Sequence, residues 1–107
     1  MAKYLISASY SSDGVKGLLA DGGTKRREVI EGLVNGLGGS VESFYYAFGS
    51  DDLHIIVDMP DNVAMTAIVL ATTSTGAVAN LTTTVLITPE EIDEAAQKTV
   101  NYTPPGA

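Results

Sequence analysis

The chain has 107 residues, of which 45% are hydrophobic and 18% charged, a composition typical of one small globular domain. Its 13 acidic and 6 basic side chains give a formal net charge of -7, which argues against nucleic acid or an anionic membrane as the main partner. The absence of cysteine excludes disulfides, thiol nucleophiles and cysteine-based zinc sites. We expect a cytoplasmic domain that works without a metal or a cofactor.

The first third of the chain predicts a strand followed by two helices. Residues 3–10 alternate between two faces, which is typical of a strand covered on one side. The next segment has helical spacing, and Ser12 or Asp13 is placed to cap it. A double glycine then breaks the chain, and Thr24 is placed to cap a second helix that Gly38 stops.

The middle of the chain predicts a hairpin and a third helix. Residues 40–48 and 53–59 are rich in β-branched and aromatic side chains, and the intervening residues 49–52 form a four-residue loop. Pro60 and Asp61 then open a helix that is apolar nearly all round, so we expect it to be largely buried. Its apolar run is about half the length that a bilayer requires.

The last third predicts a strand, a helix and a tail. Residues 79–87 form the fourth strand, and Thr88 with Glu91 makes a capping box for a final helix. We expect one domain over residues 1–98 and an extended tail over residues 99–107.

This order of elements predicts an α+β fold of the ferredoxin-like βαββαβ type, with an antiparallel sheet in the order 4-1-3-2 and its helices on one face. The other sheet face is half polar and half apolar, and a face of this kind usually has a partner. It carries Leu5, Ser7, Ser9, His54, Ile56, Asp58, Thr82, Thr84 and Leu86.

Four motifs in this order resemble the GYD domain, a small bacterial family of uncharacterised function. They are GGTKRRE, FYYAFG, PDN and TPEE, and the resemblance runs from about Tyr4 to Asp93. The family's Gly-Tyr-Asp turn, typically G-x-Y-D, has Gly49 and Asp52 in the matching positions, whereas Asp51 replaces the tyrosine. The resemblance implies a dimeric α+β barrel in which two sheets pack face to face, and therefore a homodimer.

Three consecutive basic residues, Lys25, Arg26 and Arg27, follow the double glycine. A phosphate-binding P-loop is excluded, because Gly23 stands where the motif requires lysine. Two interpretations stay open. The segment binds an anion at a helix N-terminus, or Arg26 or Arg27 pairs with a carboxylate of its own chain or of a partner; we expect the ion pair.

His54 is the only histidine and the candidate general base. It shares a strand face with Asp58, but four residues along a strand span about 13 Å, so the two cannot form a dyad directly. Tyr10 and Tyr46 join His54 and Asp58 as candidate ligand-binding residues. The alternative is that His54 is hydrogen-bonded in an interface and that the tyrosines serve only for packing.

Two functions follow from these residues. The first is a homodimer, or a larger oligomer of dimers, that binds a small molecule or serves in assembly. The second is a cofactor-independent isomerase or monooxygenase that acts on a small hydrophobic molecule between the two sheets. A closed pocket between the sheets with His54 reaching into it would favour the second.

Overall fold

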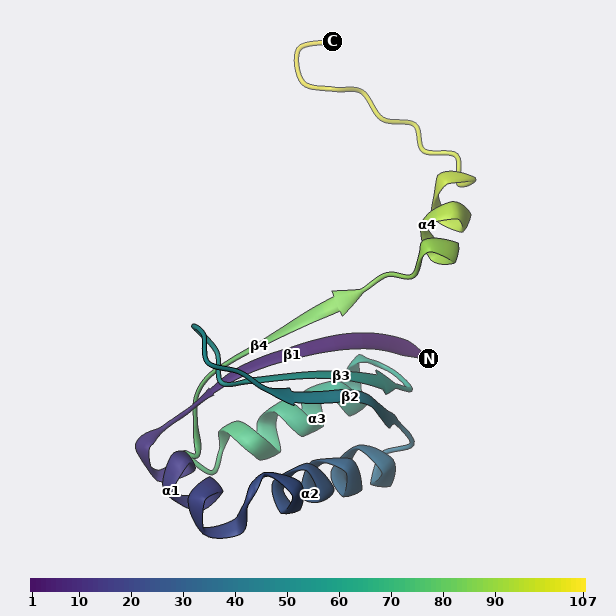
Figure 1. Ribbon diagram of the computed structural model, residues 1–107. Helices are drawn as coiled ribbons and strands as arrows, with labels where there is room; N and C mark the ends of the chain where they lie inside the picture. Colours follow the sequence, from purple (N-terminus) through teal and green to yellow (C-terminus); the bar gives the residue numbers. More distant parts are fainter.

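The computed structural model describes residues 1–107, and it confirms the predicted α+β architecture. Figure 1 shows the sheet in the middle, with α1, α2 and α3 beneath one face and α4 projecting away from both layers. The elements are β1 (Ala2–Tyr10), α1 (Ser12–Asp21), α2 (Gly23–Gly36), β2 (Ser40–Tyr46), β3 (Leu53–Met59), α3 (Asn62–Thr73), β4 (Val78–Leu86) and α4 (Pro89–Ala96).

The four strands form one antiparallel sheet in the order β2-β3-β1-β4, which is the predicted order read from the other edge. Strands β2 and β4 are therefore the two edges. Strand β2 has an irregularity between Val41 and Ser43, and β1 and β4 have one next to Tyr10. The hairpin loop between Tyr46 and Leu53 is longer than the predicted four residues, because β2 ends at Tyr46.

The core lies between the sheet and the helices. Alternate residues of β1 and β3 are buried, whereas their neighbours are only half-buried. The helices contribute Val34 from α2 and Met65 and Ile68 from α3. The strands contribute Tyr4, Ile6, Ala8, Leu53, Ile55, Val57 and Met59.

The starts of α1 and α2 differ from the prediction. Ser11, not Ser12 or Asp13, caps α1, because its hydroxyl accepts a hydrogen bond from the Gly14 N–H at 3.1 Å. Gly22 occupies the N-cap of α2 at φ 87°, and no side chain caps that helix, so the predicted role of Thr24 is wrong. The left-handed backbone of Gly22 lets one helix follow the other directly.

The prediction that α3 is largely buried is also wrong. Met65 and Ile68 face the core, but Val63 is 79% exposed and Leu70 is 63% exposed. The helices form a single layer, so the outer side of α3 has no element of this chain over it (Figure 1). Asp61 caps this helix by accepting a hydrogen bond from the Ala64 N–H at 2.8 Å.

The last helix starts as predicted. The Thr88 hydroxyl accepts from the Glu91 N–H and the Glu91 carboxylate accepts from the Thr88 N–H, both at 3.1 Å. None of the residues of α4 is buried, and the chain continues beyond it as an extended tail (Figure 1). No helix of the structure is both long enough and apolar enough to cross a membrane.

Candidate functional site

The open face of the sheet, opposite the helices, brings together side chains from all four strands. Its centre is apolar, because Leu5 of β1 lies directly opposite Ile56 of β3. Polar residues lie next to this pair along both strands, with Ser7 and His54 on one side and Lys3 on the other. Residues on this face of β1 and β3 are half-buried, whereas those on the opposite face of these strands are mostly buried.

The histidine on this face has a defined hydrogen-bond partner. The Ser7 Oγ lies 3.1 Å from the His54 Nδ1 on the neighbouring strand. On its other side, His54 is paired in register with Tyr45 of β2, which is 70% exposed. Because Ser7 engages one ring nitrogen, the ring is held in one orientation and Nε2 is left for another partner.

Asp58 has a different partner on the same face. Its carboxylate accepts hydrogen bonds from the Lys3 Nζ at 2.9 and 3.1 Å, and Glu42 lies 3.4 Å from the same nitrogen. The hydrogen bond to Asp58 raises the pKa of Lys3 above its ordinary value. Asp58 therefore neutralises Lys3 and does not orient His54.

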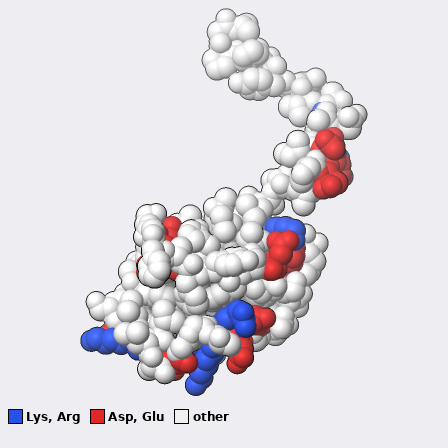
Figure 2. Space-filling view, in the orientation of Figure 1, with Lys and Arg blue, Asp and Glu red and all other residues white.

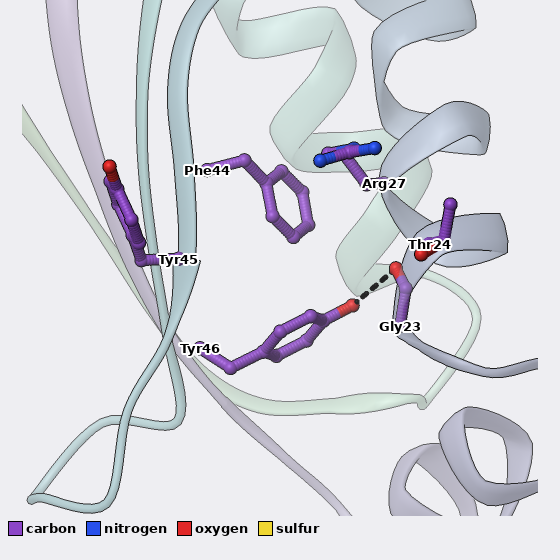
Figure 3. Close-up of a pocket in the computed structure, with 6 residues that line it drawn as sticks. All are labelled: Gly23, Thr24, Arg27, Phe44, Tyr45 and Tyr46. Atoms are coloured by element: carbon purple, nitrogen blue, oxygen red, sulfur yellow. Dashed lines mark hydrogen bonds between the residues drawn. The ribbon is translucent and has the colours of Figure 1, made fainter.

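The candidate tyrosines lie on the other side of the sheet. Tyr10 pairs with Val78, and Tyr46 donates a hydrogen bond to the Gly23 carbonyl oxygen at 3.0 Å (Figure 3). Burial raises the pKa of both phenols. His54 and Asp58 share the open face, whereas Tyr10 and Tyr46 share the helix side and are hydrogen-bonded to each other, so the four do not line one site.

An open groove of about 380 Å³ lies beside Tyr46. Figure 3 shows Phe44 and Tyr46 reaching from the strand toward the start of α2, with Arg27 beside Phe44. The Phe44 and Tyr46 rings meet edge to face, with centroids 5.4 Å apart and planes at 71°. Both rings belong to β2, and aromatic pairs favour this edge-to-face arrangement, so the pair is explained by packing alone.

The two arginines of the basic segment pair with carboxylates of their own chain. The Arg26 Nη1 lies 3.5 Å from the Asp21 Oδ2, and the Arg27 Nε lies 3.4 Å from the Glu31 Oε1. Both pairs are partly exposed, so each contributes little to stability. Figure 2 shows basic and acidic side chains intermixed over the helical layer and acidic ones gathered on α4.

The turn that carries the family motif ties the hairpin loop to the end of β1. The Asp52 carboxylate accepts a hydrogen bond from the Tyr10 N–H at 3.0 Å, and the Asp52 N–H donates to the Ala8 carbonyl oxygen at 2.9 Å. Asp51, which stands in the tyrosine position, accepts from the Ser9 hydroxyl at 3.2 Å. Asp52 is therefore a structural residue.

Sequence reasoning left two features of these sites open. The alternation of β1 and β3 placed Ser7 and His54 on one face, but their direct pairing depends on strand register. The proximity of Arg26 to Tyr10 depends on how α2 crosses the sheet, and no local signal reports it. No group of three or more histidine, aspartate or glutamate side chains is placed to hold a metal ion.

Comparison with known proteins supports this architecture. The chain resembles the crystal structure of MtbAldR at 21% identity and a TM-score of 0.59, over 81% of this chain and 53% of that one, so it spans about half the length of that relative. It resembles the crystal structure of FFRP-DM1 at 19% identity and a TM-score of 0.53, over 81% of this chain and 100% of that one. At these identities the likeness shows the fold alone. No curated protein matches the chain.

The sequence resemblance is confirmed over nearly the whole chain. The family model described as GYD domain matches residues 4–96, from the first strand to the end of α4. This chain belongs to the GYD domain family.

Proposed function

We propose that the protein is a homodimeric small-molecule-binding domain whose two copies pack their open sheet faces together. The observation that carries this proposal is the uncovered Leu5–Ile56 pair at the centre of the sheet. A half-apolar sheet face left in water is unfavourable. In a two-fold dimer the same face of a second copy would cover it, so that the apolar centres of the two sheets meet. Packing two sheets about 10 Å apart would bury this centre and cover the ring of His54 next to it.

The isolated position of α4 supports self-association independently. Helices shorter than about 12 residues are marginal in water without tertiary contacts. α4 spans Pro89–Ala96, has no buried residue and leaves Ile92 56% exposed. A second copy would give this helix a surface to pack on.

The oligomeric state tests the proposal. Light scattering on the wild-type protein should give twice the chain mass at micromolar concentration, and Ile56→Asp should give the chain mass. Val63→Asp is the matched control, because Val63 is 79% exposed on the outer side of α3. A wild-type monomer, or an Ile56→Asp dimer, would contradict the proposal.

The hydrogen bond between Ser7 and His54 favours a second candidate function, the cofactor-independent isomerase or monooxygenase. An oriented imidazole with a free Nε2 is suited to remove a proton from a molecule held between the sheets. Native mass spectrometry of purified protein checks this function: a bound hydrophobic molecule should accumulate unchanged in His54→Asn and be converted by the wild type. Because an isomer has the same mass as its precursor, the ligand released from each protein is also compared by chromatography, and an identical ligand in both proteins would favour binding alone.

A further inference from the structure

A cleft between α2 and α3 lies on the side of the sheet opposite the proposed dimer face. Its volume is about 280 Å³, room for roughly nine water molecules. The floor is formed by Tyr10 at the end of β1 and Val78 at the start of β4. The cleft is lined by Tyr10, Arg26, Val29, Ile30, Leu33, Ala71, Thr72, Thr75, Ala77 and Val78.

The two walls of the cleft do not fill it. On α2, the lining residues recur at positions i, i+3, i+4 and i+7 from Arg26 to Leu33, so one stripe of the helix faces the cleft. The opposite wall is built from small residues, including Ala71 and Ala77. Short side chains facing a row of aliphatic ones leave a space, open to solvent, that is large enough for a small molecule.

The wall residues leave few polar groups for a ligand. The hydroxyl of Thr72 donates to the Ile68 carbonyl oxygen at 2.9 Å, and that of Thr75 donates to the Thr72 carbonyl oxygen at 2.9 Å. Both hydroxyl protons are therefore used within the chain. The phenol of Tyr10 is likewise engaged, because it shares a hydrogen bond with Tyr46. The guanidinium of Arg26 is therefore the side-chain group that remains for a ligand.

Arg26 is the only charged residue of the lining. Its contact with Asp21 is a single one of 3.5 Å, and a guanidinium has five N–H donors, so most of them stay available. Burial raises the pKa of the Tyr10 phenol, and the positive charge of Arg26 lies close enough to offset part of this increase. One cation and one phenol thus stand together at one part of an otherwise apolar cleft.

We propose that this cleft binds a small monocarboxylic acid with an unbranched or flat apolar body, whose carboxylate pairs with Arg26 and whose body lies against Val29, Ile30 and Leu33. A guanidinium binds a carboxylate through two parallel N–H donors, and the aliphatic stripe accepts the body. A dianion such as a phosphate ester fits less well, because Asp21 adjoins the site and the chain already carries a net charge of -7. The site is independent of the proposed dimer, because it lies on the helix side of the sheet.

Octanoate is the probe, because its number of non-hydrogen atoms suits this volume, and 1-octanol is its neutral match. In amide NMR titrations of the full chain, octanoate should shift the resonances of residues 26–33 and 71–78, and octanol should bind at least about fivefold more weakly. Arg26→Gln should weaken octanoate by about five- to tenfold and leave octanol unchanged. Arg27→Gln is the control, because Arg27 pairs with Glu31 and does not line the cleft.

Ala71→Leu should abolish binding of both probes by filling the cleft, provided that circular dichroism shows the native helix content. The monomeric Ile56→Asp variant should bind octanoate like the wild type, so a failed dimer and a failed cleft are told apart. Equal binding of octanoate by the wild type and Arg26→Gln would overturn the proposal. Shifts confined to the open sheet face, or no binding at millimolar octanoate, would also overturn it.

Discussion

Ser7 and His54 face each other across neighbouring strands, with the Ser7 Oγ 3.1 Å from the His54 Nδ1. The pair lies beside Leu5 and Ile56 on the face that we propose to be covered by a second copy. His54 can therefore report whether the face is covered.

Chemical modification of the single histidine should report dimerisation. Diethyl pyrocarbonate should acylate His54 several-fold faster in Ile56→Asp than in the wild type, because the variant exposes the sheet face. The ultraviolet absorbance of the modified imidazole measures the rate, and Val63→Asp should react like the wild type. Equal rates in wild type and Ile56→Asp would mean that no second copy covers the histidine.

Replacing two glycines, Gly39 and Gly32, with alanine should change the free energy of unfolding in opposite directions. A Cβ at Gly39 would overlap the Asp58 carbonyl oxygen and press on Met59, so Gly39→Ala should lower the free energy of unfolding by about 1–3 kcal/mol. A Cβ at Gly32 of α2 meets nothing within 4 Å, so Gly32→Ala should raise it by up to about 1 kcal/mol. Urea unfolding at one protein concentration measures both. A tolerated Gly39→Ala would mean that β3 is displaced from the described position.

We expect the protein to lose stability at alkaline pH because of Tyr10 and Tyr46. Burial raises the pKa of Tyr10 and Tyr46 above 10.0 in the folded state. Their contribution to stability is therefore complete below pH 10.0 and is lost as the pH rises through the folded pKa values. The phenolate absorbance of the native protein should show a late component that is absent in urea, and Tyr10→Phe should reduce that component. A single native transition matching the one in urea would contradict this.

The capping box should control α4. Thr88→Ala removes the acceptor for the Glu91 N–H and should destabilise the helix by about 1 kcal/mol, whereas Thr88→Ser should keep it. The hydrogen bond from the Thr88 backbone lowers the pKa of Glu91. The contribution of the ionised Glu91 to the stability of the helix is present above the ordinary glutamate pKa, and it is lost as the pH falls through the folded pKa. Amide hydrogen exchange of residues 89–96 measures both effects, and protection unchanged by Thr88→Ala would show that other contacts hold α4.

The basic segment should be almost neutral for stability. Arg27→Ala removes a partly exposed pair with Glu31 one helical turn away and should change the free energy of unfolding by less than about 0.5 kcal/mol. Phosphate should leave the melting temperature of the wild type unchanged. If phosphate raised it, and an Arg26→Ala, Arg27→Ala double variant lost that effect, the anion-binding interpretation would be correct instead.

The element order was predictable because most elements begin or end near a local signal. Thr88, Pro89 and Glu91 specify the start of α4 within four residues, and the alternation in β1 specifies the buried face. The cap of α1 was misassigned because three candidate residues are consecutive. Ser11 is selected by tertiary contacts, since its hydroxyl donates to the Gly76 carbonyl oxygen at 2.7 Å.

The sites were less predictable because they depend on how distant segments meet. An apolar helix such as α3 shows the same pattern whether a partner covers it or not, so the exposure of Val63 and Leu70 could not be read from its residues. The cleft beside Arg26 arises from the separation of α2 and α3, which no sequence spacing encodes. The placement of Tyr10 and His54 on opposite faces could have been predicted, since the alternation of β1 places Tyr10 on the face opposite Ser7.

Strand β4 is an exposed sheet edge that could promote aggregation of this chain at high concentration. It forms one border of the sheet with nine residues, VANLTTTVL, that include neither a charge nor a proline. The unpaired N–H and C=O groups of such a border are a template for another strand, and sideways growth of this kind leads toward fibrils. Four carboxylates follow this strand closely in the sequence and oppose such growth by charge repulsion. They belong to Glu90, Glu91, Asp93 and Glu94. Each added sheet would bring a further acidic helix beside the last, so the repulsion would increase as the stack lengthened.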